Sequence, residues 1–178
     1  LADGVLTARA PITRRVIEAM ERCRIIVRYG IGVDTVDIPA ATERGIMVAN
    51  VPDYCVDEVS DHALTLLLML SRQMIAAISL ARQDRWAMNN FPALHRLRGQ
   101  VCGLVGCGKI GSLLAGKAAQ LGMRVLIHDP YMSESRAREM GAELVSFDAL
   151  LAQSDYISLH APLNDETHHF FGEAAFAK

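Results

Sequence analysis

The chain has 178 residues, enough for one large domain or for parts of two. Hydrophobic residues make up 51% and charged residues 21%, a composition that can bury a core and excludes a disordered tail. The net charge of −2, with no dense basic cluster, argues against general binding to nucleic acid or to an anionic membrane surface.

The first part of the chain alternates short β-branched runs with helical patterns. Strands are expected at residues 5–6, 25–27 and 46–48, and helices at 11–20 and 37–44 lie between them. Pro11 suits a first helical turn, and Gly45 is a typical C-terminal stop. This β-α-β-α-β order predicts a parallel sheet.

Two long helices are expected next, at residues 56–72 and 73–85. Their apolar residues recur all round the helix, which predicts burial on several sides. The most apolar run, residues 64–70, is too short to span a bilayer, so no membrane segment is expected. Residues 89–98 are expected to be irregular, because the proline of Phe91-Pro92 breaks a helix.

The strand–helix pattern then starts again. Strands are expected at 101–105, at 124–128, around Leu144 and at 156–159. Helices are expected at 109–121, 133–140 and 147–152. Two α/β blocks separated by a long helical segment suggest two domains. The first block begins on the approach to a strand and the last ends inside a helix, so both domains are expected to be incomplete in this chain.

A glycine motif opens the second block. The strand at 101–105 leads into Gly106-x-Gly108-x-x-Gly111. Gly106 permits a tight turn, Gly108 lets the backbone approach a pyrophosphate, and Gly111 allows close helix–strand packing. The backbone N–H groups of Lys109 and Ile110, at the positive end of the helix dipole, would face the phosphates. The alternatives are a tight turn without a ligand and a solvated Lys109.

An acid follows the next strand. Asp129 comes 18 residues after Gly111, close to the spacing of the carboxylate that binds the adenosine ribose. Such a carboxylate repels a 2′-phosphate, which predicts NAD in preference to NADP. The alternative is that Asp129 caps a helix after Pro130.

Two further strand ends are candidate binding sites. The loop Arg28-Tyr29-Gly30-Ile31-Gly32 can direct successive N–H groups at an anion, and Arg28 can add a charge-assisted bond to a phosphate or carboxylate. The alternative is an ordinary turn. His160, with Ala161 and Pro162, ends a strand where ligands of open α/β folds bind, although a hydrogen-bonded structural histidine is the alternative.

The cysteines suggest a reducing compartment. Cys23, Cys55, Cys102 and Cys107 show no CxxC spacing and no neighbouring histidine pair, so no metal site is expected. They are interpreted as reduced thiols of a cytoplasmic protein.

Taken together, the chain resembles the D-isomer-specific 2-hydroxyacid dehydrogenases, within them the phosphoglycerate dehydrogenase and C-terminal-binding-protein-like branch. The likeness covers essentially all 178 residues. The segments that carry it are RYGIGVD (28–34) with Val36-Asp37, GIMVANVP (45–52), VSDHA (59–63), GLVGCGKIG (103–111), and DYISLHAPL (155–163) with Thr167.

The resemblance implies an α/β protein with two domains and an active site between them. Residues 1–54 would be part of a flavodoxin-like substrate-binding domain, and residues 100–178 the first half of a Rossmann-like NAD-binding domain. Residues 55–99 would be the linking helices and a dimerisation arm, the arm being around residues 86–98, so a homodimer is implied.

The resemblance also implies roles for single residues. Arg28, Tyr29, Gly30 and Ile31 would bind the substrate carboxylate. Val51 would approach the nicotinamide, and a group of residues after the last strand would lie against its ribose: His160, Ala161, Pro162 and Thr167.

The implied activity is hydride transfer between NAD(H) and C2 of a 2-hydroxy/2-oxo acid. The catalytic arginine, glutamate and histidine of the family are expected beyond Lys178, so no catalytic residue is predicted here and the 178 residues alone are expected to be inactive. The alternatives are an NAD(H)-sensing dimeric scaffold of the corepressor type and an inactive truncated paralogue.

Overall fold

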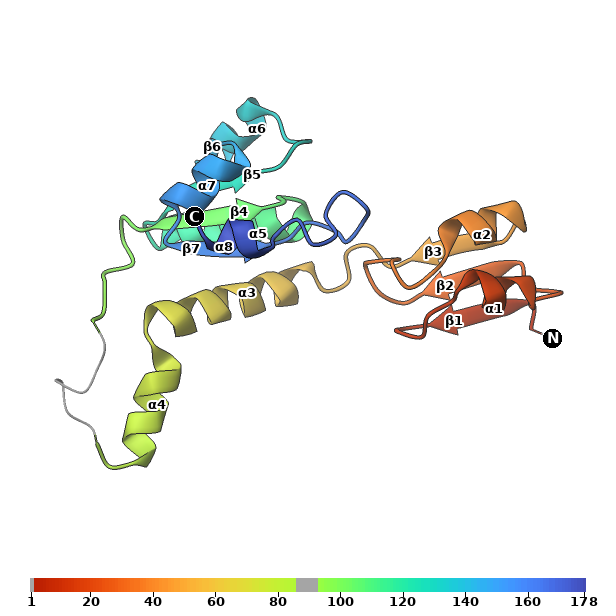
Figure 1. Ribbon diagram of the computed structural model, residues 1–178, viewed down its shortest axis with the longest axis horizontal. Coiled ribbons are helices and arrows are strands. Elements are labelled where there is room, and N and C mark those ends of the chain that lie inside the picture. The colour runs from red at the N-terminus through yellow and green to blue at the C-terminus, as the bar shows by residue number, and fades with distance from the viewer. Residues whose placement is uncertain (1, 86–92) are drawn as a thin grey trace. The chain divides into compact units, whose positions relative to one another are not determined.

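The computed structural model describes residues 2–85 and 93–178 and divides into two compact units. Unit 1 comprises Leu1–Cys55 and Pro162–His168, and unit 2 comprises Val56–Ala161 and His169–Lys178. Figure 1 labels the elements of both. Each unit contains a parallel sheet, which confirms the predicted α/β class.

Unit 1 is a three-stranded parallel sheet in the order β1-β2-β3. Its strands are β1 (Gly4–Thr7), β2 (Ile25–Arg28) and β3 (Met47–Asn50), joined by the short helices α1 (Arg14–Glu18) and α2 (Ile38–Glu43). The register places Thr7, Arg28 and Asn50 level with one another at the carboxyl ends of the strands. Loops that follow the three strands therefore meet at one edge of the sheet.

An N-cap hydrogen bond and a β-bridge determine where the two helices of unit 1 begin. Asp37 caps α2 by accepting a 2.9 Å hydrogen bond from the Ala40 amide, as an N-cap acid does. The helix predicted at 11–20 is shorter, because Ile12 forms a β-bridge with Val36 and α1 begins only after Thr13. The core of the unit consists of apolar residues from both layers, including Ile17, Ile26 and Ala41.

Unit 2 has a four-stranded parallel sheet in the order β6-β5-β4-β7. The strands are β4 (Val101–Val105), β5 (Arg124–His128), β6 (Glu143–Leu144) and β7 (Tyr156–Leu159). The helices that connect or follow them are α5 (Lys109–Gln120), α6 (Glu134–Glu139), α7 (Phe147–Gln153) and α8 (Glu173–Phe176). The strand–helix order predicted for this block is confirmed.

Both faces of this second sheet are covered. Cys102 and Leu104 of β4 join one apolar cluster with residues of α3 and α5, whereas Val105 joins a second cluster with Leu150 of α7. This division follows from the alternation of side chains along a strand. At its central strands, unit 2 therefore has three layers, with helices on both faces of the sheet.

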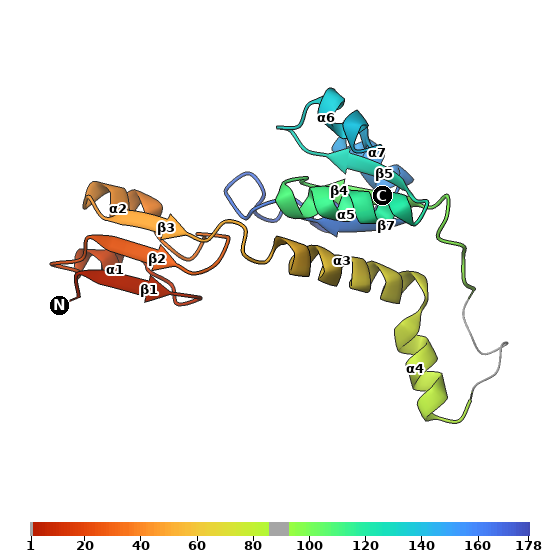
Figure 2. The ribbon, with the colours of Figure 1, turned by 180° about the vertical axis from the view of Figure 1, so that it is seen from behind.

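A long helix, α3 (Val56–Ser71), packs against α5 and lies beside it in both views (Figures 1 and 2). The Lys117 ammonium of α5 joins the two helices, because it donates to the Ser60 hydroxyl and to the Asp61 carboxylate, each at 2.5 Å. The next helix, α4 (Met74–Arg82), bends away at Gln73, whose φ of 51° is left-handed. Among the described residues no single helix could cross a membrane; α3 and α4 reach the necessary length and composition only together, across a 63° bend.

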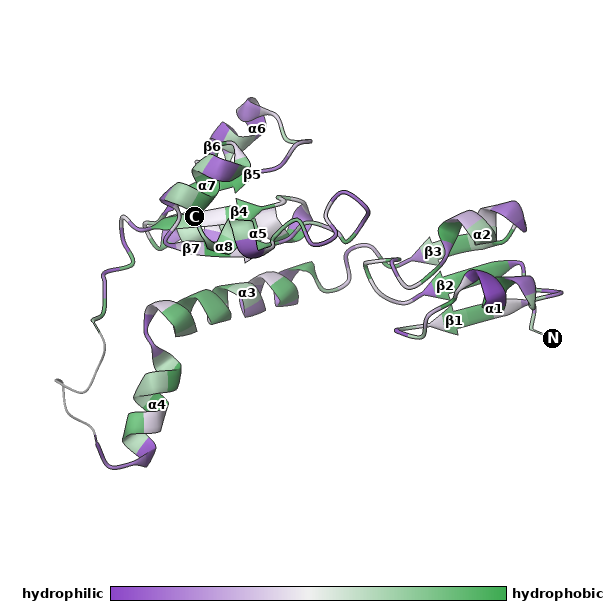
Figure 3. Cartoon of the chain, in the orientation of Figure 1, coloured by the Kyte–Doolittle hydropathy of each residue, from purple (hydrophilic) through white to green (hydrophobic). Residues whose placement is uncertain are grey.

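The prediction that these two helices are buried on several sides is wrong. Figure 3 shows both mostly in the green of hydrophobic residues, but Leu70 is 67% exposed and Ile75 is 72% exposed. Along α3, only Ser60, Leu67 and Ser71 are buried. The residues of α3 are apolar, as the sequence shows, but α5 covers only one side of this helix, so the other apolar side chains remain exposed.

The predicted irregular segment, residues 89–98, and the predicted dimerisation arm fall partly on residues 86–92, which lie outside the described residues. Residues 93–98 contain no helix or strand.

Candidate functional site

The glycine motif of unit 2 forms a turn that is closed by neighbouring backbone. Gly106 has a φ of +80°, and a Cβ there would lie 2.6 Å from the Ala161 nitrogen. A Cβ on Gly111 would lie 2.8 Å from the Gly106 oxygen. Both positions therefore require glycine, Gly106 for its conformation and both for close approach.

Gly108 differs, because no protein atom lies within 4 Å of a Cβ placed there. It is the N-cap of α5, and as a glycine it has no side chain that could accept from the first turn. Backbone N–H groups in the first turn of a helix have no intrahelical acceptor, and here that turn carries the amides of Ile110 and Gly111. Open space beside these donors suits a bound anion.

Asp129 lies at the carboxyl end of β5 and holds the glycine turn. Its Oδ2 accepts from the Cys107 amide at 2.8 Å, and its Oδ1 accepts from the Tyr131 amide at 2.9 Å. Ser133 is the N-cap of α6, so the alternative that Asp129 caps this helix is wrong. Each carboxylate oxygen can accept a second hydrogen bond, which leaves capacity for a hydroxyl group of a ligand.

These residues fit a dinucleotide on grounds of their own chemistry. The open face at Gly108 admits a pyrophosphate to the first turn of α5, and Asp129 lies beside the same turn with acceptor capacity for a ribose diol. Lys109, Ile110 and Gly111 form the first turn, as the motif predicted.

The cysteines of this region remain protonated. All four cysteines of the chain are free, and Cys102 and Cys107 are buried. Burial raises the pKa of the Cys102 thiol to about 11 and also raises the pKa of Cys107. The low-pKa thiolate of a redox cysteine is therefore not formed at either position.

His160 packs beside the glycine turn. Its backbone amide donates to the Val105 oxygen at 2.7 Å, and its ring Nε2 lies 2.9 Å from the Ser158 hydroxyl. Burial lowers the pKa of the imidazole, which favours the neutral ring. The structure thus shows the hydrogen bond of the structural alternative and also places His160 and Ala161 against Gly106 and Gly111.

Pro162 and Thr167 lie in a turn counted with unit 1. The Thr167 hydroxyl donates to the Pro162 oxygen at 2.5 Å and accepts from the Asn164 amide at 2.9 Å. These bonds close the turn, and they bring the two predicted residues together.

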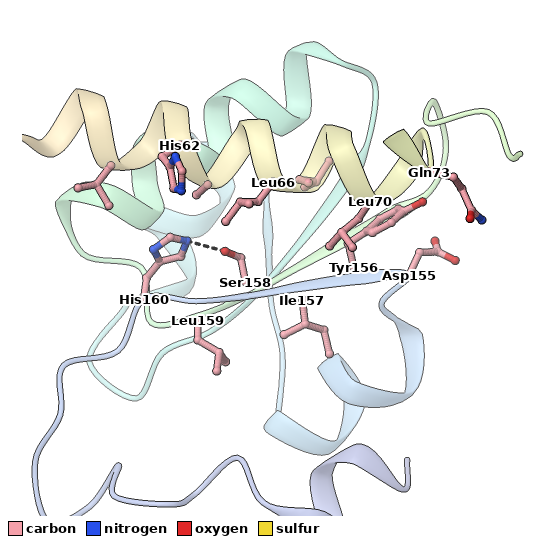
Figure 4. Close-up of a pocket in the computed structure, with 13 residues that line it drawn as sticks. His62, Leu66, Leu70, Gln73, Asp155, Tyr156, Ile157, Ser158, Leu159 and His160 are labelled. Carbon is pink, nitrogen blue, oxygen red and sulfur yellow. Dashed lines mark hydrogen bonds between the residues drawn. The ribbon is translucent and has the colours of Figure 1, made fainter. Parts of the chain in front are cut away.

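A groove of about 790 Å³ runs between α3 and β7 (Figure 4). Its walls are mainly apolar, with Leu66 and Leu70 from the helix and Ile157 from the strand. His62, His160 and Ser158 lie near one end, and Gln73 and Asp155 near the other. The sequence did not predict this groove, since hydropathy does not show that a helix and an edge strand leave space between them.

The anion loop predicted in unit 1 is held from two sides. The Nε of Arg28 donates to the Ala8 oxygen at 3.0 Å, and the Asn50 side chain donates to the Ile31 oxygen at 2.7 Å. A Cβ on Gly30 would overlap the Arg28 guanidinium, so glycine is needed for this side chain to fold back over the loop. The Val51 amide donates to the Gly30 oxygen at 3.2 Å, which brings that predicted residue to the same loop.

No metal centre was predicted. Within residues 2–85 and 93–178, no group of three or more histidine, cysteine, aspartate or glutamate side chains could hold a metal ion.

Residues 64–178 match the family described as "D-isomer specific 2-hydroxyacid dehydrogenase, NAD binding domain". The D-3-phosphoglycerate dehydrogenase of Mycobacterium tuberculosis (strain ATCC 25618 / H37Rv) is 40% identical over 178 residues, covering 99% of this chain and 34% of the relative. The glyoxylate reductase of Korarchaeum cryptofilum is 37% identical over 166 residues, covering 92% of this chain and 50% of the relative.

Among solved structures, the D-lactate dehydrogenase from Aquifex aeolicus, complexed with NAD and lactic acid, superposes with a TM-score of 0.94 at 28% identity. The match covers 99% of this chain and 53% of that one. An acyclic imino acid reductase in complex with NADPH and D-Arg superposes with a TM-score of 0.89 at 26% identity, covering 99% and 56%. The chain thus spans between about a third and a little over half of the length of these relatives.

Proposed function

The chain belongs to the D-isomer-specific 2-hydroxyacid dehydrogenase family, and we propose that the protein containing it transfers hydride between NAD(H) and C2 of a 2-hydroxy/2-oxo acid. The observation that carries the proposal is the open first turn of α5 at Gly108, with the Asp129 carboxylate beside it. A turn without a ligand would need Gly106 and Gly111 for packing, but it would not need open space at Gly108.

In this proposal the amides of Ile110 and Gly111, with Lys109 in the same turn, hold the pyrophosphate, and Asp129 accepts from the adenosine ribose. A carboxylate at that position repels a 2′-phosphate, so NAD is preferred to NADP. When bound, the nicotinamide gives or accepts the hydride. His160, Ala161, Pro162, Thr167 and Val51 are the residues proposed to contact that end of the coenzyme.

The substrate carboxylate is proposed to bind at Arg28, Tyr29, Gly30 and Ile31. Support comes from the bonds that hold the loop with Arg28 folded over Gly30. The family's catalytic histidine, arginine and glutamate are not assigned to any residue of this chain, which contributes binding and positioning. The 178 residues alone are expected to be inactive.

The domain boundaries follow the same proposal. Residues 1–54 belong to a flavodoxin-like substrate-binding domain, 55–99 to linking helices with a dimerisation arm, and 100–178 to the first half of a Rossmann-like domain. The protein is proposed to be a cytoplasmic homodimer. Exposed apolar residues of α3 and α4, among them Leu70 and Ile75, support a partner surface on these helices.

The test is NADH oxidation by the full-length protein with a panel of 2-oxo acids, repeated with NADPH. Turnover of at least one 2-oxo acid, faster with NADH than with NADPH, is expected. No turnover across the panel, together with dimerisation driven by NADH, would instead support the scaffold. Absence of any NADH binding would overturn both.

A further inference from the structure

The imidazole ring of His160 is held by one residue, Ser158 of β7. The Ser158 hydroxyl lies 2.9 Å from the His160 Nε2, and the two side chains stand on the same side of the extended chain because they are two residues apart. Figure 4 shows this hydrogen bond at one end of the groove between α3 and β7. Across the described residues, neither the ring nor the hydroxyl has another hydrogen-bond partner, and His62, at the same end of the groove, bonds to neither.

The hydrogen-bonding capacity of the two groups indicates which ring nitrogen carries the proton. Burial lowers the pKa of His160, and the neutral ring has one nitrogen that donates and one that accepts. If Nε2 carried the proton, Ser158 would accept its hydrogen bond. The hydroxyl hydrogen would then have no protein acceptor in the part of the chain that the structure describes, in a groove with mainly apolar walls. If Ser158 donates to Nε2, both groups are satisfied, so the Nδ1–H tautomer is favoured.

The second ring nitrogen, Nδ1, is accessible to a ligand. It has no partner among the described residues, yet it is not one of the buried side-chain atoms that lack a partner, which are the hydroxyls of Thr35 and Ser154. The residue also lies against the glycine turn, since a Cβ on Gly111 would be 3.6 Å from the His160 Cβ. Nδ1–H is thus an accessible donor beside the turn that is proposed to bind the coenzyme.

We propose that Ser158 is a positioning residue, which holds His160 as the Nδ1–H tautomer so that this nitrogen donates to an oxygen at the nicotinamide end of the coenzyme. The inference rests on the proposed function, in which His160 contacts that end. A neutral donor suits this place, because the nicotinamide ring of NAD⁺ is positively charged and would repel a cation beside it. Without the Ser158 hydroxyl, neither the tautomer nor the orientation of the ring is fixed.

The first test measures the tautomer directly and does not depend on the coenzyme. In the full-length protein with isotope-labelled histidine, nitrogen chemical shifts distinguish a protonated from an unprotonated ring nitrogen, and His160→Asn identifies the signal by its loss. The Nδ1–H tautomer is expected in the wild type and in Ser158→Thr, which keeps the hydroxyl, but not as the preferred form in Ser158→Ala. A wild-type ring protonated at Nε2, or an unchanged tautomer in Ser158→Ala, overturns the proposal and leaves the proposed function standing.

The second test is NADH titration of the same full-length proteins, each first shown to be folded. Ser158→Ala is expected to weaken NADH binding by about three- to tenfold, the effect of one lost hydrogen bond, and Ser158→Thr should bind within about twofold of the wild type. The control, Thr42→Val, removes an exposed hydroxyl of α2 and should leave the affinity unchanged. In a His160→Asn background, Ser158→Ala should cause no further loss, because the two residues act as one unit.

Two results of this titration would refute the positioning role. One is full NADH affinity in Ser158→Ala, and the other is an equal loss of affinity with and without His160, which would indicate that Ser158 acts only through the structure of the strand. In both cases NADH still binds, so the proposed function stands. A wild-type protein that binds no NADH would instead refute the proposed function and this proposal with it.

Discussion

Two glycines of the same turn should respond to alanine in opposite ways. At Gly106 an alanine Cβ would lie 2.6 Å from the Ala161 nitrogen and 2.8 Å from its Cα, at a φ of +80°. At Gly108 the same methyl group would meet no protein atom within 4 Å, and the φ of −70° is one that any residue adopts. Gly106→Ala is therefore expected to impair folding, and Gly108→Ala to impair coenzyme binding.

The expected magnitudes follow from these contacts. A left-handed conformation costs an L-residue about 1–2 kcal/mol, and overpacking against backbone adds about 1–3 kcal/mol. Gly106→Ala should thus lower the free energy of unfolding by about 2–5 kcal/mol. Gly108→Ala should change it by less than about 1 kcal/mol, since an unstrained alanine restricts only the unfolded chain.

The assay is urea unfolding of the full-length protein followed by NADH titration of each variant that folds. Gly116→Ala is the matched control, because it lies within α5 with nothing within 4 Å of its Cβ. It should raise stability by about 0.5–1 kcal/mol and leave NADH affinity unchanged. The reasoning is refuted if Gly108→Ala binds NADH as tightly as the wild type, or if it loses as much stability as Gly106→Ala.

Two further outcomes are expected in unit 2. Lys117→Met should lower the free energy of unfolding by about 1–2 kcal/mol, mainly because the bond to buried Ser60 is lost, since Asp61 is largely exposed. Amide hydrogen exchange in α3 measures this loss of stability. The control is Arg138→Met, at an exposed ion pair, which should change the free energy of unfolding by less than about 0.5 kcal/mol. Burial lowers the pKa of His160 below its ordinary 6.5, so the unfolded chain binds more protons and the protein should lose stability as the pH drops below about 6.5. In thermal unfolding at several pH values, His160→Asn should lose less stability over this pH range than the wild type. An equal loss of stability in the two proteins would contradict the burial argument.

The sequence predicted the parts of the fold that depend on local pattern. Gly106, Gly108 and Gly111 serve the turn that their spacing predicted, and the helix α2 begins after Asp37 and ends before Gly45, as the sequence indicated. Such features succeed because the backbone conformation or the cap depends on the residue itself and its near neighbours.

Other features depend on residues far apart in the sequence, and these were missed. Lys117 binds Ser60 from 57 residues away, and Arg28 bonds to Ala8 from 20 residues away. The exposure of Leu70 was not predicted either, because a run of apolar residues does not show on how many sides a helix is covered. Asp129 was predicted only in part. The sequence predicted its position after the strand, but not its hydrogen bond with the Cys107 amide.

Those bonds make a change of coenzyme difficult. Asp129 holds the glycine turn by accepting from the Cys107 amide, and the same carboxylate is the one proposed to bind the ribose. Replacing the acid to admit a 2′-phosphate would release that amide at the same time, so one substitution would alter nucleotide selectivity and loosen the binding loop together. If the protein prefers NAD as proposed, a variant designed to accept NADP would need another acceptor for the Cys107 amide.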